Sequence, residues 1–71
     1  MSNKQREMLE LRAIRVSTRA ALRAVSSDDE VERVKTMSTE LLARLEGEVI
    51  RHGADPGVIA ALEAARRELW D

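Results

Sequence analysis

The chain lacks several of the residue types that commonly stabilise small proteins. Among its 71 residues there is no cysteine, no phenylalanine and no tyrosine, and there is a single tryptophan, Trp70. The absence of cysteine excludes disulfide bonds and thiolate metal sites, and it fits a reducing cytoplasm, where we expect the protein to act. No apolar run approaches the roughly 20 residues that a membrane-spanning helix needs, and none follows the opening MSNKQRE, so we expect neither a membrane span nor a signal peptide.

The scarcity of aromatic residues limits the core to aliphatic side chains. A folded chain of this length buries only about 60% of the surface that it exposes when unfolded, so a single copy is marginally stable. Domains of this size are commonly stabilised by disulfides, by a metal or by a second copy of the chain. Because the sequence has neither cysteines nor a set of metal ligands, it favours self-association into a homodimer.

Charge is plentiful and unevenly distributed. The formal net charge is −1. Residues 1–25 carry six basic and two acidic side chains, whereas residues 26–52 carry four basic and seven acidic ones. Residues 53–71 carry two basic and four acidic side chains. Opposite charges on adjacent antiparallel segments attract modestly and favour the correct pairing.

Apolar residues recur at three- and four-residue steps in three segments, and this spacing predicts helices over residues 3–25, 28–52 and 56–70. No strand pattern is present. The sequence therefore predicts one all-α domain over residues 1–71: a long antiparallel helical hairpin with a short third helix, dimerising into a helical bundle.

Residues at the segment ends support these boundaries. Ser27 and Glu30 have the spacing of a capping box, Gly53 suits a left-handed helix end, and Asp55 precedes Pro56 as an N-cap precedes the first helical position. The first break contains neither glycine nor proline. A single rod running through Ser27 is therefore the alternative to the hairpin.

Each predicted helix has a face that we expect to be buried. On the first helix this face is Met8, Leu11, Ile14, Thr18, Ala21, Leu22 and Val25. On the second it is Val31, Val34, Ser38, Leu41, Leu45 and His52, with Leu42 and Val49 beside it. On the third it is Val58, Ala61, Leu62, Ala65 and Leu69.

The first helix has a second apolar strip on roughly the opposite side, which has no obvious partner within the chain. We expect its members to form the dimer interface, since small side chains let two helices approach closely: Leu9, Ala13, Val16 and Ala20.

Between the two apolar strips runs a stripe of arginines: Arg12, Arg15, Arg19 and Arg23. Three interpretations are open: a solvated flank, a contact with a partner protein, or a contact with the phosphates of RNA or DNA. The net charge and the lack of stacking aromatic residues disfavour nucleic acid. As partner-binding candidates we take Arg12, Arg19 and Arg23, together with the acidic cluster Asp28, Asp29, Glu30 and Glu32.

Two further candidates lie off the apolar face of the third helix. Ile59 and Trp70 share one side of it, with Arg66 between them. Either these residues cover a hydrophobic edge of the bundle, or they anchor a partner, as tryptophan beside arginine often does in interfaces.

The sequence contains no recognisable catalytic or cofactor-binding set. There is no Ser/His/Asp arrangement, no glycine-rich phosphate loop and no metal-ligand spacing, and we expect neither an enzyme nor a cofactor. The only histidine, His52, ends the second helix, and we interpret it as a boundary residue.

The stretches MSNKQREMLELRAIR, SSDDEVERV and RHGADPGVIAALEAARREL resemble the small early proteins of bacterial viruses, among them the quorum-sensing anti-activators, in length and helical character. This resemblance implies a helical dimer that sequesters a host transcriptional regulator or ATPase. The break GADPG is also similar to that of the small helical co-chaperones of type III secretion systems. Residues 2–52 resemble the plasmid-encoded helical hairpin that binds paired RNA loops.

The sequence thus predicts a non-enzymatic interaction module that binds and occludes a partner protein. The alternatives are a secretion adaptor and a nucleic-acid-binding dimer that uses the arginine stripe.

Overall fold

The computed structural model describes residues 2–70, so Met1 and Asp71 of the expected domain lie outside the described part of the chain. Residues 2–70 form three α-helices and no strand: α1 (Asn3–Ala24), α2 (Asp28–Arg51) and α3 (Pro56–Trp70). The expectation of an all-α chain with three helices is confirmed for these residues. Ser27 lies outside the helices, which excludes the single rod.

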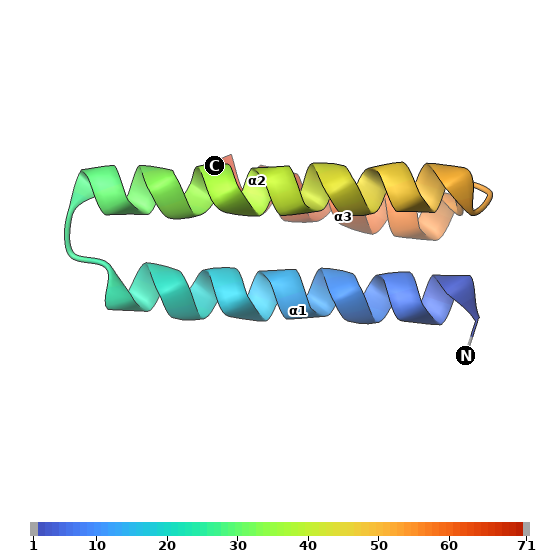
Figure 1. Ribbon diagram of the computed structural model, residues 1–71, viewed down its shortest axis with the longest axis horizontal. Helices are drawn as coiled ribbons and strands as arrows, with labels where there is room; N and C mark the ends of the chain where they lie inside the picture. The colour runs from blue at the N-terminus through green and yellow to red at the C-terminus, as the bar shows by residue number, and fades with distance from the viewer. Residues whose placement is uncertain (1, 71) are drawn as a thin grey trace.

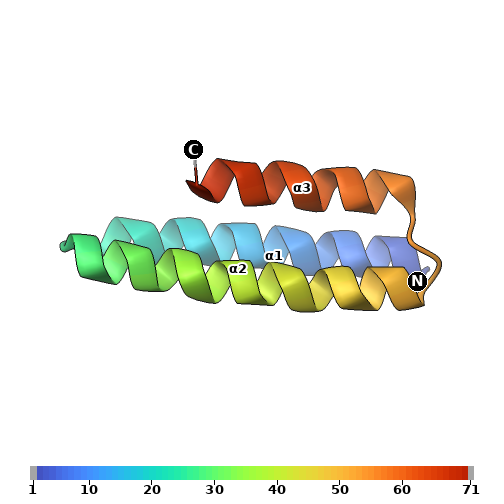
Figure 2. The same cartoon turned by 90° about the horizontal axis from the view of Figure 1, so that it is seen from above.

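The three helices pack side by side in an elongated bundle measuring 39 × 19 × 16 Å. α1 and α2 run in opposite directions and are joined by a short turn (Figure 1). From the other end α3 runs back along the pair and packs on one face of it (Figure 2). Because α3 has 15 residues against 22 in α1 and 24 in α2, it leaves the end of the pair near the α1–α2 turn uncovered.

Side-chain caps begin α1 and α2. Ser2 Oγ accepts a hydrogen bond from the backbone N–H of Gln5 at 3.2 Å, and the Ser2 N–H donates to Gln5 Oε1 at 3.0 Å, which makes a full capping box. At the start of α2, Ser27 Oγ accepts from the backbone N–H of Glu30 at 3.2 Å. Each cap satisfies a backbone donor that the first turn of a helix leaves without a partner.

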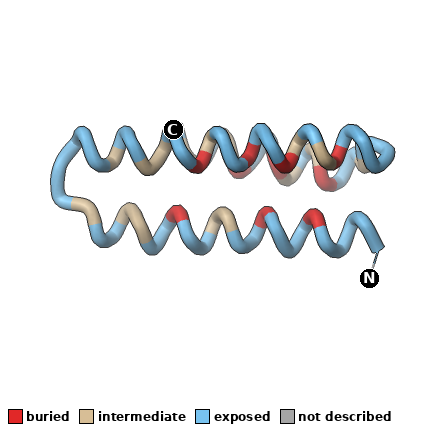
Figure 3. The backbone as a smooth tube through the Cα atoms, in the orientation of Figure 1, coloured by how far each residue is buried: buried red, intermediate tan, exposed pale blue. Residues whose placement is uncertain are grey.

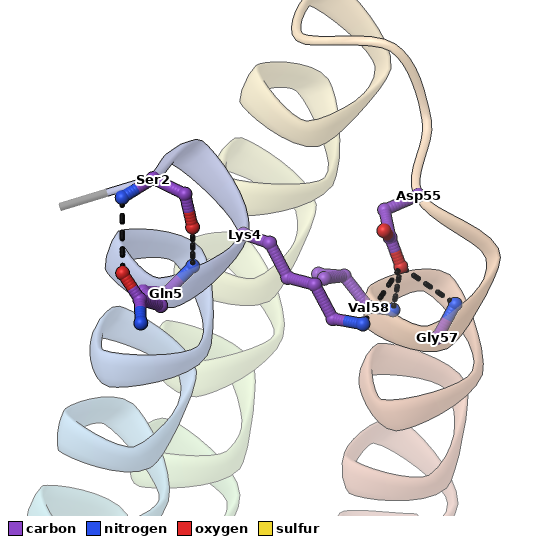
Figure 4. Close-up of polar contacts among 6 residues, drawn as sticks. All are labelled: Ser2, Lys4, Gln5, Asp55, Gly57 and Val58. Carbon is purple, nitrogen blue, oxygen red and sulfur yellow. Dashed lines mark hydrogen bonds and ion pairs between the residues drawn. The ribbon is translucent and has the colours of Figure 1, made fainter.

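Asp55 caps α3 and also ties it to α1. Its Oδ1 accepts from the backbone N–H groups of Gly57 at 2.9 Å and Val58 at 3.2 Å (Figure 4). The ammonium group of Lys4 lies 3.9 Å from the same oxygen. The start of α3 is therefore held beside the start of α1.

The α2–α3 connection uses left-handed backbone. Gly53 has a φ of 104° and Ala54 a φ of 52°. The Ala54 N–H donates to the carbonyl of Val49 at 2.8 Å, which closes the end of α2. This geometry is readily reached by glycine and strained for alanine.

The core lies where all three helices meet. Its buried side chains are Leu11, Leu42, Leu45, Val49, Val58, Leu62 and Ala65. Figure 3 shows that the buried positions stop short of the α1–α2 turn. The core therefore occupies only the part of the α1–α2 pair that α3 covers.

The buried face of α2 differs from the expected one. Leu41 is 41% exposed, whereas Leu42 and Val49, which were expected beside the seam, are fully buried. The reason is that α2 packs against both α1 and α3, so its buried face is directed between them. Val31 and Val34 are only half-buried, because α3 ends at Trp70, which contacts Thr39 and Lys35 farther along α2.

Two polar pairs lie in or at the edge of this interior. Thr18 Oγ1 donates to the carbonyl of Ile14 at 2.7 Å, so Ser38 donates its hydroxyl proton to Thr18 across the 2.6 Å contact between α1 and α2. Glu7 is buried, with its side chain 4% exposed, and its Oε2 lies 3.2 Å from His52 Nδ1. His52 caps the end of α2, as its interpretation as a boundary residue predicted, and its ring also contacts this carboxylate.

Candidate protein-binding groove

The described surface has an open groove between α1 and α3, with a volume of about 950 Å³. We call it the α1–α3 groove. Its lining residues are Lys4, Gln5, Met8, Leu9, Leu11, Arg12, Arg15, Val16, Arg19 and Ala61. Nine of the ten come from α1. The groove therefore exposes one long side of that helix.

Small residues on α3 keep this groove open. Ala61 is the α3 residue that lines it. Gly57 and Ala64 lie four residues before and three residues after Ala61, so helical spacing places them on the same edge. The large side chains Ile59 and Trp70 are directed elsewhere, because Ile59 packs against the core and Trp70 contacts α2. An α3 edge without bulk leaves Met8 of α1 exposed, although it was expected in the core.

Four cationic side chains and no acidic ones line the α1–α3 groove. Arg15 donates two hydrogen bonds of 2.9 Å to the carboxylate of Glu68 on α3, and Lys4 contacts Asp55. Among residues 2–70, no ion pair within 4.0 Å is formed by Arg12 or Arg19. These two guanidinium groups are therefore the groove charges that have no acidic partner among residues 2–70.

The expected dimer strip lies beside this groove and is exposed throughout. Leu9 is 52% exposed and Val16 is 58% exposed, and Ala13 and Ala20 are exposed as well. Leu9 and Val16 also line the groove, so the two surfaces share an edge.

The expected partner-binding residues do not form one site. Arg12 and Arg19 both line the groove. Arg23 is exposed at the end of α1, and the acidic cluster is exposed at the start of α2: Asp28, Asp29, Glu30 and Glu32. That end of the pair is the one farthest from the α2–α3 connection (Figure 1).

Trp70 is held against α2 within the chain. Its indole N–H donates to Thr39 Oγ1 at 2.9 Å, and Lys35 Nζ lies 5.6 Å from the ring centre. On the same side of α3, Arg66 donates to Glu46 Oε2 at 3.1 Å. These contacts clamp the end of α3 to α2, on the edge opposite the α1–α3 groove.

Met8, Lys4 and Ala61 were not predicted to belong to one surface. The signal that points to it is the run of small residues, Gly57, Ala61 and Ala64, at helical spacing on α3. A helix edge of that kind either approaches another helix closely or leaves a groove beside it. Which of these occurs depends on the position of α3 against α2.

Residues 2–70 also bear on metal binding and membrane insertion. That part of the chain contains no group of three or more metal-binding side chains close enough to hold an ion. None of its helices combines the length and the apolar character required to cross a lipid bilayer.

Comparison with protein-family models, with curated proteins and with solved structures finds no significant match to this chain. The function is therefore argued from the surfaces described above.

Proposed function

We propose that this protein is a non-enzymatic interaction module of the cytoplasm that binds a partner protein stoichiometrically and covers its functional face. The observation that carries the proposal is the exposed apolar side of α1, where Leu9 and Val16 are each more than half in water. Contiguous apolar surface rimmed by charge is typical of protein-interaction sites. Because the aliphatic core of the chain is small, covering the exposed apolar side of α1 adds substantially to the stability of the fold.

The assembly that we propose is a homodimer through the strip Leu9, Ala13, Val16 and Ala20. The two alanines let a second helix approach closely, and the two larger side chains supply the buried area. Sedimentation of the wild-type chain at micromolar concentration is expected to give a dimer, and Val16→Glu a monomer. A wild-type chain that sediments as a monomer contradicts this assembly.

The resemblance to viral anti-activators suggests a bacterial transcriptional regulator or ATPase as the partner, and the resemblance to secretion co-chaperones suggests a secretion-system protein. Both classes share one mechanism, since a rigid helical surface occludes a face that the partner needs.

Capture of partners from a bacterial lysate tests the position of the binding surface. We expect Arg19→Glu, in the groove, to lose a partner that Asp29→Lys, at the start of α2, retains. If both variants recover the same proteins in the same amounts as the wild type, neither cluster is the binding site.

A further inference from the structure

We propose that the α1–α3 groove binds an acidic amphipathic helix of the partner protein. This inference rests on the proposed function and specifies the chemistry of the partner. It combines three properties of the groove: its length, its apolar lining and its unbalanced positive charge.

The dimensions of the groove suit a helix. Its lining on α1 extends from Lys4 to Arg19, which at about 1.5 Å per residue corresponds to roughly 22 Å, or four helical turns. Its apolar lining residues are Met8, Leu9, Leu11, Val16 and Ala61, of which Leu9 and Val16 are the most exposed. An apolar stripe with i, i+3, i+4 and i+7 anchors is the element that fills a hydrophobic groove of this kind.

The charges of the groove select an acidic partner. Arg12 and Arg19 are seven residues apart and therefore lie on one flank of α1, two turns from each other. Glutamates spaced by two turns on an incoming helix can reach both guanidinium groups. Exposed ion pairs contribute only about 0.2–1 kcal/mol each, so we expect them to set selectivity while apolar burial supplies most of the affinity.

A second copy of the chain does not supply such a helix. Its α1 carries no acidic residue from Leu11 to Ala24, so it offers no carboxylate to Arg12 and Arg19. Its α2 is the most acidic helix, but the apolar face of α2 is already buried against α1 and α3 through Leu42 and Val49. The partner helix is thus expected to come from a different protein.

A labelled peptide of about 18 residues tests the proposal. One version carries leucine and alanine on one face with glutamate on both flanks, and the control version carries lysine in place of glutamate. By fluorescence anisotropy, we expect the full-length chain to bind the glutamate peptide at least about ten-fold more tightly than the lysine peptide.

Charge-reversed variants locate the binding. The double variant Arg12→Glu, Arg19→Glu is expected to bind the glutamate peptide about ten-fold more weakly and to reverse the preference between peptides. The matched control is Arg33→Glu, Arg44→Glu, which makes the same change of charge at exposed positions of α2, and its affinity is expected to stay within about two-fold of the wild type.

Three outcomes overturn the inference. They are equal affinity for the two peptides, equal loss in the groove variant and the α2 control, and tighter binding of a short DNA duplex than of the glutamate peptide. If the glutamate peptide fails to bind but the wild-type chain still forms a dimer that Val16→Glu dissociates, the inference fails and the proposed interaction function stands. If peptide binding and dimerisation both fail, the proposed function fails too.

Discussion

At the scale of single residues, Glu7 is an unusual component of this bundle, because a carboxylate is buried with one polar contact, to His52 at 3.2 Å. A buried acceptor that loses its partner keeps the cost of desolvation without the compensating bond. We expect His52→Ala to lower the free energy of unfolding by about 1–2 kcal/mol. Urea denaturation followed by circular dichroism measures this change.

Glu7→Leu is the informative counterpart. It replaces the buried carboxylate with an apolar side chain of similar length, and it leaves the partly exposed His52 hydrated. Replacing a buried polar pair with apolar groups is often neutral or stabilising, so we expect Glu7→Leu to cost less than His52→Ala. The opposite order of stability indicates that the contact between the two side chains is strongly favourable in its own right.

At the scale of elements, the α2–α3 connection places strain at a definite position. Ala54 has a positive φ of 52°, and Gly53 one of 104°. A Cβ added at Gly53 meets no atom within 4 Å, so the cost of Gly53→Ala is conformational alone. We expect that variant to lose about 1–2 kcal/mol of stability, and Ala54→Gly to be neutral or to gain up to about 1 kcal/mol. Thermal unfolding of both variants checks this, and equal destabilisation by the two would contradict the geometry.

Helix ends and helix faces differ in how far the sequence predicts them. Ser27 and Asp55 cap the helices that follow them, and such caps depend only on residues within four positions. The buried face of α2 depends on where a third helix packs, which explains why Leu41 was expected in the seam and Leu42 only beside it.

The burial of Glu7 could have been anticipated from the sequence. Glu7 is four residues before Leu11, on the face expected to be buried, and antiparallel pairing of α1 with α2 brings it opposite His52. Its burial was not predicted, because the buried face of the first helix was assigned almost entirely from apolar residues and Glu7 is acidic.

The candidate site was predicted only in part, because helical periodicity predicts surfaces that belong to one helix and not those that lie between two. The exposed apolar strip and the arginine stripe of α1 follow from helical periodicity, since both belong to one helix. The α1–α3 groove was not predicted, because it lies between two helices and depends on the small side chains around Ala61 on α3.

At the scale of the whole molecule, the bundle is thinner at one end. Near the α1–α2 turn only two helices pack together, and Leu22, Val31 and Val34 are half-buried there. A second hollow of about 340 Å³ lies where α3 ends, lined in part by Leu22, Lys35 and Leu69. We expect backbone amides of α2 before Ser38 to exchange with solvent faster than those after Leu42, as regions with few buried contacts open locally. Uniform protection along α2 in hydrogen exchange would contradict this gradient.

The dimer proposed through the strip Leu9, Ala13, Val16 and Ala20 predicts that the stability of the molecule depends on its concentration. If unfolding separates two copies, each ten-fold rise in protein concentration adds about 1.4 kcal/mol to the stability of the dimer, which moves the urea midpoint upward by roughly 0.5–1 M. Val16→Glu places a charge in the proposed interface and is expected to abolish this dependence. Ile50→Glu is the matched control, because Ile50 on α2 is exposed to the same 58% as Val16 but lies outside the strip. A midpoint that does not change with concentration in the wild-type chain, or that loses its dependence equally in both variants, shows that the exposed side of α1 is not where two copies meet.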